Sequence, residues 1–237
     1  MIPVLGVPVL NRSDLLYGML ESIDHPVGRI VVIDNGDVVS RYELEQIQPG
    51  IRLIKPGANI GVAASWNLVM KANPWAPWWF LVNNDIVFQP GDLARLEQTV
   101  QPEAALFHML SFAAFAVTRQ ALDVLGYFDE NFHPAYDEDV DYAYRCQLAT
   151  VPRIGVLSAA RHVGSATIYA DKLYRNQNGK THGLNDRYYE RKWGGPKMGG
   201  ETFTTPFDRG GSIGDWTLEP SRLREQGWEV RAIRAVR

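Results

Sequence analysis

Cysteine is nearly absent from this sequence, which has only Cys146 among its 237 residues. An intrachain disulfide is therefore excluded, and the helical pattern around Cys146 predicts a small buried side chain. Long apolar runs are absent as well, since none approaches the roughly 20 residues that a membrane-spanning helix needs. The apolar start, MIPVLGVPVL, lacks the basic flank and cleavage site of a signal peptide. We therefore expect a first strand there and a cytoplasmic protein.

Glycine-rich nucleotide-binding signatures are missing too. The first apolar segment continues as GVPVLNR and has one glycine, Gly6, where a dinucleotide-binding dehydrogenase would carry G-x-G-x-x-G. It also lacks the glycine-rich loop with an arginine that nucleotidyltransferases use. A dehydrogenase and a nucleotidyltransferase are therefore the weaker enzyme interpretations.

Positive charge is scarce in the first part of the chain. Residues 1–144 hold 8 Lys and Arg against 18 Asp and Glu, a net charge of -10. Residues 145–237 hold 16 against 9, a net charge of +7. This asymmetry has two interpretations: the C-terminal third binds something anionic, or it neutralises the acidic part of the same protein.

Apolar segments typical of strands alternate with segments of helical spacing. Strands are predicted at 2–10, 29–34, 51–55 and 78–85, and helices at 14–24, 41–47 and from residue 62. This alternation predicts an α/β domain with a mostly parallel sheet flanked by helices. Later segments predict a strand pair at 105–119, helices at 119–125 and from Asp137, and a strand that ends at His162. Beyond residue 170 little periodicity remains, so we expect one domain with an irregular C-terminal extension.

Polar residues stand where three predicted parallel strands end. They are Asn11-Arg12, Asp34-Asn35 and Asn83-Asn84-Asp85. Such strand ends meet at one edge of the sheet, where ligands bind. Asp34 can accept an N–H of a nucleobase, and Asp85 with His162 can bind a divalent cation, for which imidazole favours Mn²⁺ over Mg²⁺. A structural interpretation stands beside each: Asp34 favours a turn, Asp85 ends its strand, and His162 packs.

Four carboxylates crowd the stretch AYDEDVDYAYR at residues 135–145. At a helix start, Asp137, Glu138 and Asp139 would favour the positive end of the helix dipole. Asp141 is spaced to pair with Arg145 one turn later. A carboxylate at a helix start that faces a cleft is also well placed to act as a general base.

Seven segments, in this order, resemble a known family. They are VPVLNR at 7–12, VVIDNGD at 31–37, NIGVAASWN at 59–67, FLVNNDIVF at 80–88, GYFDENF at 126–132, DEDVDYAYR at 137–145 and HVGS at 162–165. Together they are similar to GT-A-fold glycosyltransferases of the large family-2-like group of inverting enzymes. The resemblance implies a Rossmann-like catalytic core at 1–170, with nucleotide-sugar binding in its first half and the acceptor and base side in its second. Residues 171–237 would be an extension packed on the same domain.

The resemblance also implies roles on the donor side. Pro8, Leu10, Asn11 and Arg12 would line the nucleotide pocket, Asp34 would contact the base, and Asn59, Gly61 and Asn67 would shape the diphosphate and ribose side. The segment Asn83-Asn84-Asp85 would occupy the Asp-x-Asp metal site of the family. Asn83 replaces the first aspartate, so Asp85 is the expected direct ligand of Mn²⁺ or Mg²⁺ and His162 gains importance.

On the acceptor side, the resemblance makes Asp139 the catalytic base. It places Asp129, Glu138 and Trp193 beside the acceptor. The implied activity is metal-dependent, inverting transfer of a sugar from a nucleoside-diphosphate sugar to a hydroxyl of a saccharide or a lipid-linked glycan.

Two alternatives remain open at this point. The first is glycosylation of a hydroxylated base in DNA, because basic and aromatic residues interleave in the C-terminal third. The basic residues are Arg187, Arg191, Lys192 and Lys197, and the aromatic ones are Tyr188, Tyr189 and Trp193. The second is a relative that binds nucleotide sugars without turnover, which the substitution at Asn83 makes conceivable.

Overall fold

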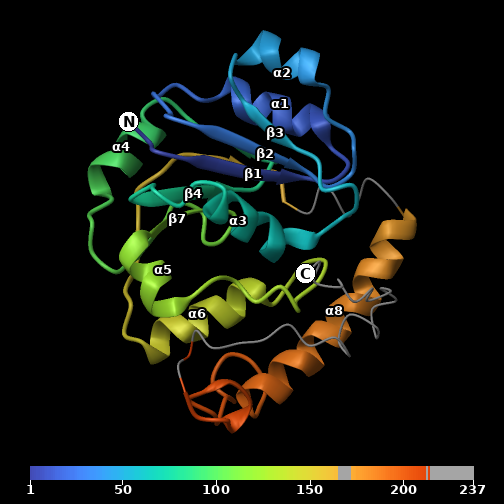
Figure 1. The fold of residues 1–237 in the computed structure, drawn as a ribbon, viewed down its shortest axis with the longest axis vertical. Helices are drawn as coiled ribbons and strands as arrows, with labels where there is room; N and C mark the ends of the chain where they lie inside the picture. Colours follow the sequence, from blue (N-terminus) through green and yellow to red (C-terminus); the bar gives the residue numbers. More distant parts are fainter. Residues whose placement is uncertain (165–171, 212, 214–237) are drawn as a thin grey trace, which may run out of the picture.

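The computed structural model describes residues 1–164, 172–211 and 213 (Figure 1). Its centre is a seven-stranded sheet in the order β3-β2-β1-β4-β7-β6-β8. The strands are β1 (Leu5–Val9), β2 (Ile30–Asp34), β3 (Arg52–Ile54), β4 (Trp78–Val82), β6 (Leu106–His108), β7 (Ala114–Thr118) and β8 (Arg153–Gly155). Only β7 among these strands runs against the others, because it pairs antiparallel with both β4 and β6. The predicted mostly parallel sheet, including the strand pair β6–β7, is confirmed.

Helices cover both faces of the sheet (Figure 1). They are α1 (Ser13–Glu21), α2 (Arg41–Ile47), α3 (Gly61–Lys71), α4 (Asp92–Thr99), α5 (Arg119–Leu125), α6 (Glu138–Leu148) and α8 (Lys172–Trp193), followed by a short 3-10 helix at Pro206–Asp208. Apolar residues of α1, α2 and α4 pack on one face, and those of α3, α5 and α6 on the other. Because both faces are covered, β1, β2 and β4 are apolar almost throughout rather than alternating.

The direction of side chains in β2 shows how one strand serves both cores. Ile30 and Val32 belong to the core under α1, whereas Val31 and Ile33 belong to the core that includes Trp66 of α3. This alternation follows from the two-residue period of a strand. It also leaves the ends of the strands, rather than their faces, as the place where polar side chains gather.

The chain after residue 170 departs from expectation. An irregular extension was predicted, but Lys172–Trp193 form α8, a helix of 22 residues. Its buried positions have helical spacing, but only Tyr188, Tyr189 and Trp193 among them are aromatic. The other buried positions are polar or charged: Asn178, Thr181, Asn185 and Lys192. A search for apolar periodicity therefore overlooks this helix. The predicted boundary at 170–171 and residues 214–237 lie outside the described residues, so the division into a core and an extension stays a prediction.

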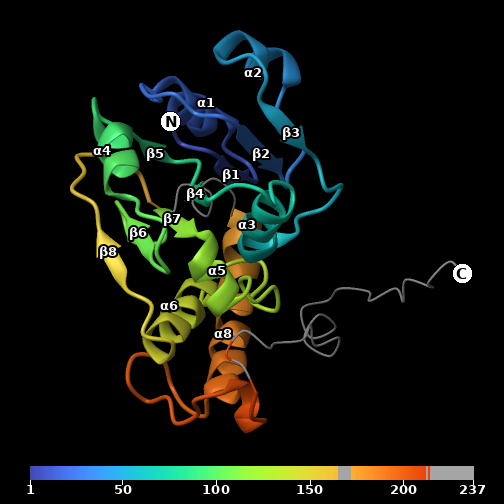
Figure 2. The same cartoon turned by 60° about the vertical axis from the view of Figure 1, so that its left-hand side comes forward.

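The helix α6 lies between the sheet and α8 (Figure 2). Its residues Tyr142 and Cys146 are buried in the core on the sheet. Its residues Val140, Tyr144 and Leu148 are partly buried against the aromatic cluster of Phe132, Tyr188, Tyr189 and Trp193. A helix placed in this way is held from both sides, which matters for the carboxylates at its N-terminus.

Among the described residues, no helix combines the length and the apolar composition needed to cross a bilayer.

Candidate functional site

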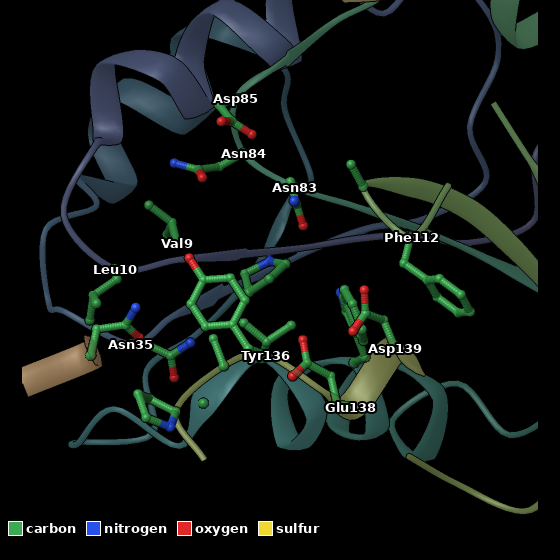
Figure 3. Close-up of a pocket in the computed structure, with 18 of the residues that line it drawn as sticks. Val9, Leu10, Asn35, Asn83, Asn84, Asp85, Phe112, Tyr136, Glu138 and Asp139 are labelled. Atoms are coloured by element: carbon green, nitrogen blue, oxygen red, sulfur yellow. The ribbon is translucent and has the colours of Figure 1, made fainter. Parts of the chain in front are cut away.

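A pocket of about 400 Å³ opens at the carboxyl ends of β1, β2 and β4 (Figure 3). The start of α6 and the turn between β6 and β7 close its other side. Ten of the residues predicted from the sequence line it: Pro8, Leu10, Asn59, Gly61, Asn83, Asn84, Asp85, Glu138, Asp139 and His162. The parallel strands thus bring together residues from segments that are far apart in the sequence.

Asp85 and His162 meet at one edge of the pocket. They are brought together by a small second sheet, in which β5 (Ile86–Val87) pairs antiparallel with β9 (Arg161–His162). The Nε2 atom of His162 lies 3.1 Å from Oδ1 of Asp85, and the N–H of Gly164 donates to the Oδ2 atom at 3.0 Å. A carboxylate and an imidazole that face each other on a pocket wall form a donor set that suits a divalent cation such as Mn²⁺.

Glu138 and Asp139 lie across the pocket from Asn83, Asn84 and Asp85 (Figure 3). Glu138 is 5% exposed, and its Oε2 atom has no hydrogen-bond partner within the described part of the chain. Burial, together with the negative charge of Asp139, raises the pKa of Glu138 well above its ordinary value. Burial also raises the pKa of Asp139, although the Val140 N–H donates to its Oδ1 at 2.9 Å.

The turn that precedes these two carboxylates has an unusual backbone. Tyr136 and Asp137 have φ angles of 76° and 71°, in the left-handed region that residues other than glycine rarely adopt. On the facing side, Gly61 has a φ of 83°, and a Cβ atom there would lie 2.9 Å from the ring of His133 and from the Pro134 carbonyl oxygen. The Val62 N–H donates to that same carbonyl at 2.8 Å. Only glycine at position 61 allows α3 to begin so close to this turn.

The other two crowded carboxylates have cationic partners. Asp141 pairs with Arg145 at 2.9 Å, as the spacing predicted, and also with Lys192 at 2.6 Å. Lys192 contacts Asp129 at 2.7 Å as well, and all four side chains are fully buried. Asp137 instead receives the ammonium group of Lys197 at 2.6 Å. Both lysines come from the basic C-terminal third of the chain.

Two predicted acceptor-side residues belong to this buried network rather than to the pocket. Asp129 accepts from the Tyr188 hydroxyl at 2.9 Å in addition to its contact with Lys192. Although burial alone would raise its pKa, Lys192 and Asn131 hold the pKa of Asp129 below its ordinary value. Trp193 donates from Nε1 to Asp141 at 2.8 Å and is fully buried. Both residues fasten α8 to the core, which places them behind the pocket wall.

Four predicted donor residues also lie off the pocket wall. Asp34 uses both carboxylate oxygens to accept from the N–H groups of Gly36, Val38 and Val39, so it holds its own turn. Asn67 bonds to the N–H and the carbonyl of Phe128 at 2.9 and 2.8 Å and thereby secures the loop before α6. Asn11 and Arg12 sit next to the wall, and the Arg12 guanidinium pairs with Asp14.

Residues that sequence reasoning did not select also line the pocket. Asn35 follows Asp34, and its side chain joins the end of β2 to α3 through Ser65 Oγ at 2.9 Å and the Ile60 N–H at 3.1 Å. Tyr136 and Phe112 line the other side. Asn35 carried a signal, because it belongs to the polar pair at the end of β2. Neither aromatic residue stood in a recognisable pattern.

A smaller cavity of about 110 Å³ adjoins the pocket, and Ser111 and Phe112 line both. Its other walls include His108 and Arg153. Burial and the neighbouring positive charge of Arg153 lower the pKa of His108, so this imidazole is neutral at pH 7. The space beyond Phe112 is therefore lined by one cationic and one neutral polar group.

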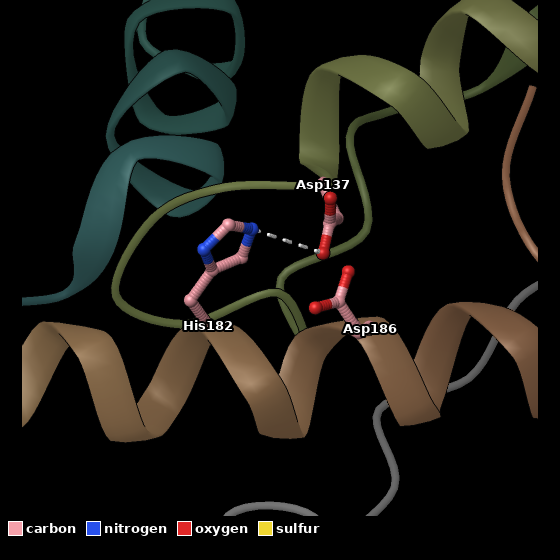
Figure 4. Close-up of side chains that lie close together, drawn as sticks. All are labelled: Asp137, His182 and Asp186. Atoms are coloured by element: carbon pink, nitrogen blue, oxygen red, sulfur yellow. Dashed lines mark ion pairs between the residues drawn. The ribbon is translucent and has the colours of Figure 1, made fainter.

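One further cluster has the composition of a metal site. Ligand atoms of Asp137, His182 and Asp186 lie within 4.8 Å of one another (Figure 4). The Lys197 ammonium group, however, contacts Asp137 at 2.6 Å and Asp186 at 2.7 Å. A cation already occupies the anionic side of this cluster, so we interpret it as an ion-pair network.

No protein-family model matches the chain. A galactofuranosyl glycosyltransferase of Leishmania donovani is 50% identical over 38 residues, which are 16% of this chain and 9% of that protein. The chain thus matches a small part of the length of this curated relative.

Solved structures match over much more of the chain. Glucosyl-3-phosphoglycerate synthase from Mycobacterium tuberculosis, in complex with Mn²⁺ and uridine-diphosphate-glucose, has a TM-score of 0.52 at 13% identity, over 76% of this chain and 77% of that chain. S. aureus TarS has a TM-score of 0.51 at 13% identity, over 78% of this chain and 43% of TarS. At such identities the likeness concerns the fold alone. The chain therefore has the GT-A fold of nucleotide-sugar glycosyltransferases.

Proposed function

We propose that this protein is an inverting glycosyltransferase that moves a sugar from a nucleoside-diphosphate sugar to a hydroxyl group of an acceptor. The observation that carries the proposal is the pocket itself. It sets two carboxylates without a cationic partner in the described chain, Glu138 and Asp139, opposite Asp85 and His162 at the strand ends of a GT-A fold. The M. tuberculosis neighbour, which was solved with Mn²⁺ and uridine-diphosphate-glucose, supports a nucleotide-sugar donor.

Asp139 is the proposed catalytic base. It removes the proton from the acceptor hydroxyl while that oxygen attacks the anomeric carbon from the face opposite the diphosphate. The bond to the diphosphate breaks in the same step, so the configuration inverts. Binding donor and acceptor in line removes much of the entropic barrier of a two-substrate reaction. A raised pKa makes the carboxylate of Asp139 a stronger base.

Glu138 has a different part in this arrangement. Two adjacent carboxylates in a buried site resist double ionisation, and Glu138 is the more buried of the two. A protonated Glu138 leaves the negative charge on Asp139 and offers an O–H donor toward the pocket. We propose that this donor orients a hydroxyl group of the acceptor.

Asp85 and His162 fit a divalent cation, most simply Mn²⁺. When bound there, the cation would supply positive charge that neutralises the leaving diphosphate. Asn83 and Asn84, which line the same edge, would contribute amide groups toward the donor. Pro8, Leu10 and Asn59 form the adjoining wall, where we place the nucleoside.

A transfer assay with Asp139→Asn tests the base assignment. Nucleotide sugars are first screened with Mn²⁺ for thermal stabilisation, and the release of nucleoside diphosphate is then measured with acceptors. Asp139→Asn should lower turnover by roughly 10²- to 10⁴-fold and leave donor affinity nearly intact. Asp123→Asn, at an exposed carboxylate of α5, is the matched control. Wild-type turnover in Asp139→Asn, or a product of retained configuration, would contradict the proposal.

The proposed acceptor is a saccharide or a lipid-linked glycan. Glycosylation of a hydroxylated base in DNA is the alternative, but Tyr188, Tyr189 and Trp193 are buried and Lys192 is paired, so these residues are not available to stack or bind a strand. Arg187 and Arg191 remain exposed. Binding to hydroxymethylated duplex DNA that weakens steeply with salt would favour the alternative, and no binding at low salt would exclude it.

A non-catalytic relative is the second alternative, because Asn83 stands where the family motif has an aspartate. Such a protein would gain thermal stability from a nucleotide sugar and Mn²⁺ but would neither hydrolyse nor transfer it. Hydrolysis of the donor without acceptor therefore separates the two. The cytoplasmic location expected from the sequence stays a prediction.

A further inference from the structure

The turn at Ala135–Asp137 is strained, and it directly precedes the two pocket carboxylates. Tyr136 and Asp137 are consecutive residues in the left-handed region, with φ angles of 76° and 71°. A non-glycine residue in this region is disfavoured by its Cβ atom, and it persists only where surrounding contacts hold it.

The contacts come from α8 and from the segment that follows it. The side-chain amide of Asn185 donates to the carbonyl oxygens of both Ala135 and Tyr136, at 2.9 Å each. The ring of His182 lies 4.8 Å from that of Tyr136, measured between centroids. The backbone and the side chain of Tyr136 are thus both held by α8.

The last contact is ionic. Lys197 bridges the carboxylates of Asp137 and Asp186 at 2.6 and 2.7 Å. Asp137 is buried, and its other oxygen, Oδ2, lies 4.0 Å from Nε2 of His182 (Figure 4). Asp137, which immediately precedes Glu138, is therefore tied to α8 through its own side chain. The backbone just before it is tied to α8 through Asn185.

We propose that His182, Asn185, Asp186 and Lys197, which we name the α8 clamp, hold this strained turn and thereby position Glu138 and Asp139 in the pocket. The clamp residues are positioning residues, since they act through the turn. Asn185 is buried, and its two hydrogen bonds fix the direction of the carbonyls at the point where the chain enters α6. Lys197 fixes the Asp137 side chain at the end of that turn.

The proposal rests on the function proposed above. It predicts that loss of the clamp affects kcat and the donor KM differently. The donor wall is built by the ends of β1, β2 and β4, whereas the base is carried by α6, which the clamped turn leads into. A displaced base lowers turnover, and a misplacement of about 1 Å can lower the reaction rate on the order of 10²-fold. Loss of the clamp should therefore lower kcat and leave the donor KM almost unchanged.

The experiment compares four variants with the wild-type protein. Asn185→Ala and Lys197→Met each remove one part of the clamp, and Lys197→Arg keeps the positive charge. Lys180→Met removes an exposed lysine of α8 and is the control. Amide hydrogen exchange across residues 134–141, thermal unfolding, donor KM and kcat are measured for each.

Asn185→Ala and Lys197→Met should speed exchange at residues 135–139 and lower kcat by about 10- to 100-fold, with a donor KM within about twofold of the wild-type value. Lys197→Arg should recover most of the turnover, and Lys180→Met should match the wild type. Unchanged exchange in both variants would overturn the clamp. Faster exchange with unchanged kcat would overturn its positioning role. If the wild-type protein transfers no sugar, the proposed function fails, and exchange alone then decides whether the clamp exists.

Discussion

Four carboxylates within five residues have two kinds of surroundings. Asp137 and Asp141 each contact a lysine at 2.6 Å, and Asp141 contacts Arg145 as well. Glu138 and Asp139 have no ion pair within the described residues and line the pocket. The same residue types, side by side on one helix start, thus divide into a pair that holds the structure and a pair that faces the ligand space.

The difference shows where the neutralising charge comes from. Lys192 and Lys197 lie in the basic C-terminal third, more than 50 residues after Asp141 and Asp137, which they contact. Part of the charge asymmetry in the sequence is therefore neutralised within the molecule. A buried carboxylate with cations on all sides is a poor base, whereas one that is buried without them is a strong base. The α8 helix and the segment after it supply an ion pair to each carboxylate of the first pair, and within the described residues they supply none to the second pair.

The largest effect on stability is expected from Lys192→Met. This change leaves Asp129 and Asp141 buried together with only Arg145 to neutralise them, and breaking a buried ion pair in this way costs about 3–5 kcal/mol. Urea denaturation monitored by tryptophan fluorescence measures the change in unfolding free energy. Lys180→Met, on an exposed position of the same helix, is the control. A loss below about 1 kcal/mol, which is typical of an exposed ion pair, would show that the network does not hold α8 to the core.

Glu138→Gln should change how stability depends on pH. Because the folded protein raises the pKa of Glu138 above its ordinary value of 4.5, the folded state binds the proton more tightly than the unfolded state does. The unfolding free energy should therefore fall as the pH rises from about 4.5 toward the raised pKa, by at most about 1.4 kcal/mol per pH unit. Glu138→Gln removes this contribution, so the variant should be the more stable protein at neutral pH, with the difference shrinking below pH 4.5.

Denaturation curves at several pH values decide this prediction. The exposed Asp123→Asn variant should keep the wild-type slope. A slope in Glu138→Gln equal to that of the wild type would mean that Glu138 is ionised in the folded protein. Glu138 and Asp139 would then carry the same charge, and the protonated donor proposed for Glu138 would be lost.

The sequence predicted the parallel half of the fold well, because buried parallel strands and short helices have strong apolar patterns. The helices Arg41–Ile47 and Arg119–Leu125 occur at the predicted bounds. The helix α8 was missed for a physical reason: its buried stripe is built from Asn178, Thr181, Asn185 and Lys192, whose burial depends on partners elsewhere in the chain. No local pattern reveals that a lysine will find two aspartates.

Prediction of the candidate site from the sequence has the same limit. Strand ends predicted which residues meet at the pocket, and Asp85 and His162 do meet. The position of a residue at a strand end does not indicate the direction in which its side chain points. Asp34 and Asp85 both stand at the end of an apolar strand and look equivalent in sequence. Asp85 lines the pocket, yet Asp34 turns back onto three backbone N–H groups of its own loop.

The smallest effect is expected from Tyr144→Phe, which tests a neutral attachment on the same helix. The Tyr144 hydroxyl donates to the Phe203 carbonyl at 3.0 Å, and its ring packs edge-on against Trp193, with centroids 4.9 Å apart. Phenylalanine keeps the ring contact and loses the hydrogen bond, which costs about 0.5–1.5 kcal/mol because the partly buried carbonyl can turn to water. Denaturation under the conditions used for Lys192→Met gives the comparison directly. Tyr144→Phe and Lys192→Met could instead lower the unfolding free energy by the same amount. Ion pairs would then hold α6 no more strongly than a neutral hydrogen bond does. The difference between the paired and unpaired carboxylates of α6 would need another explanation.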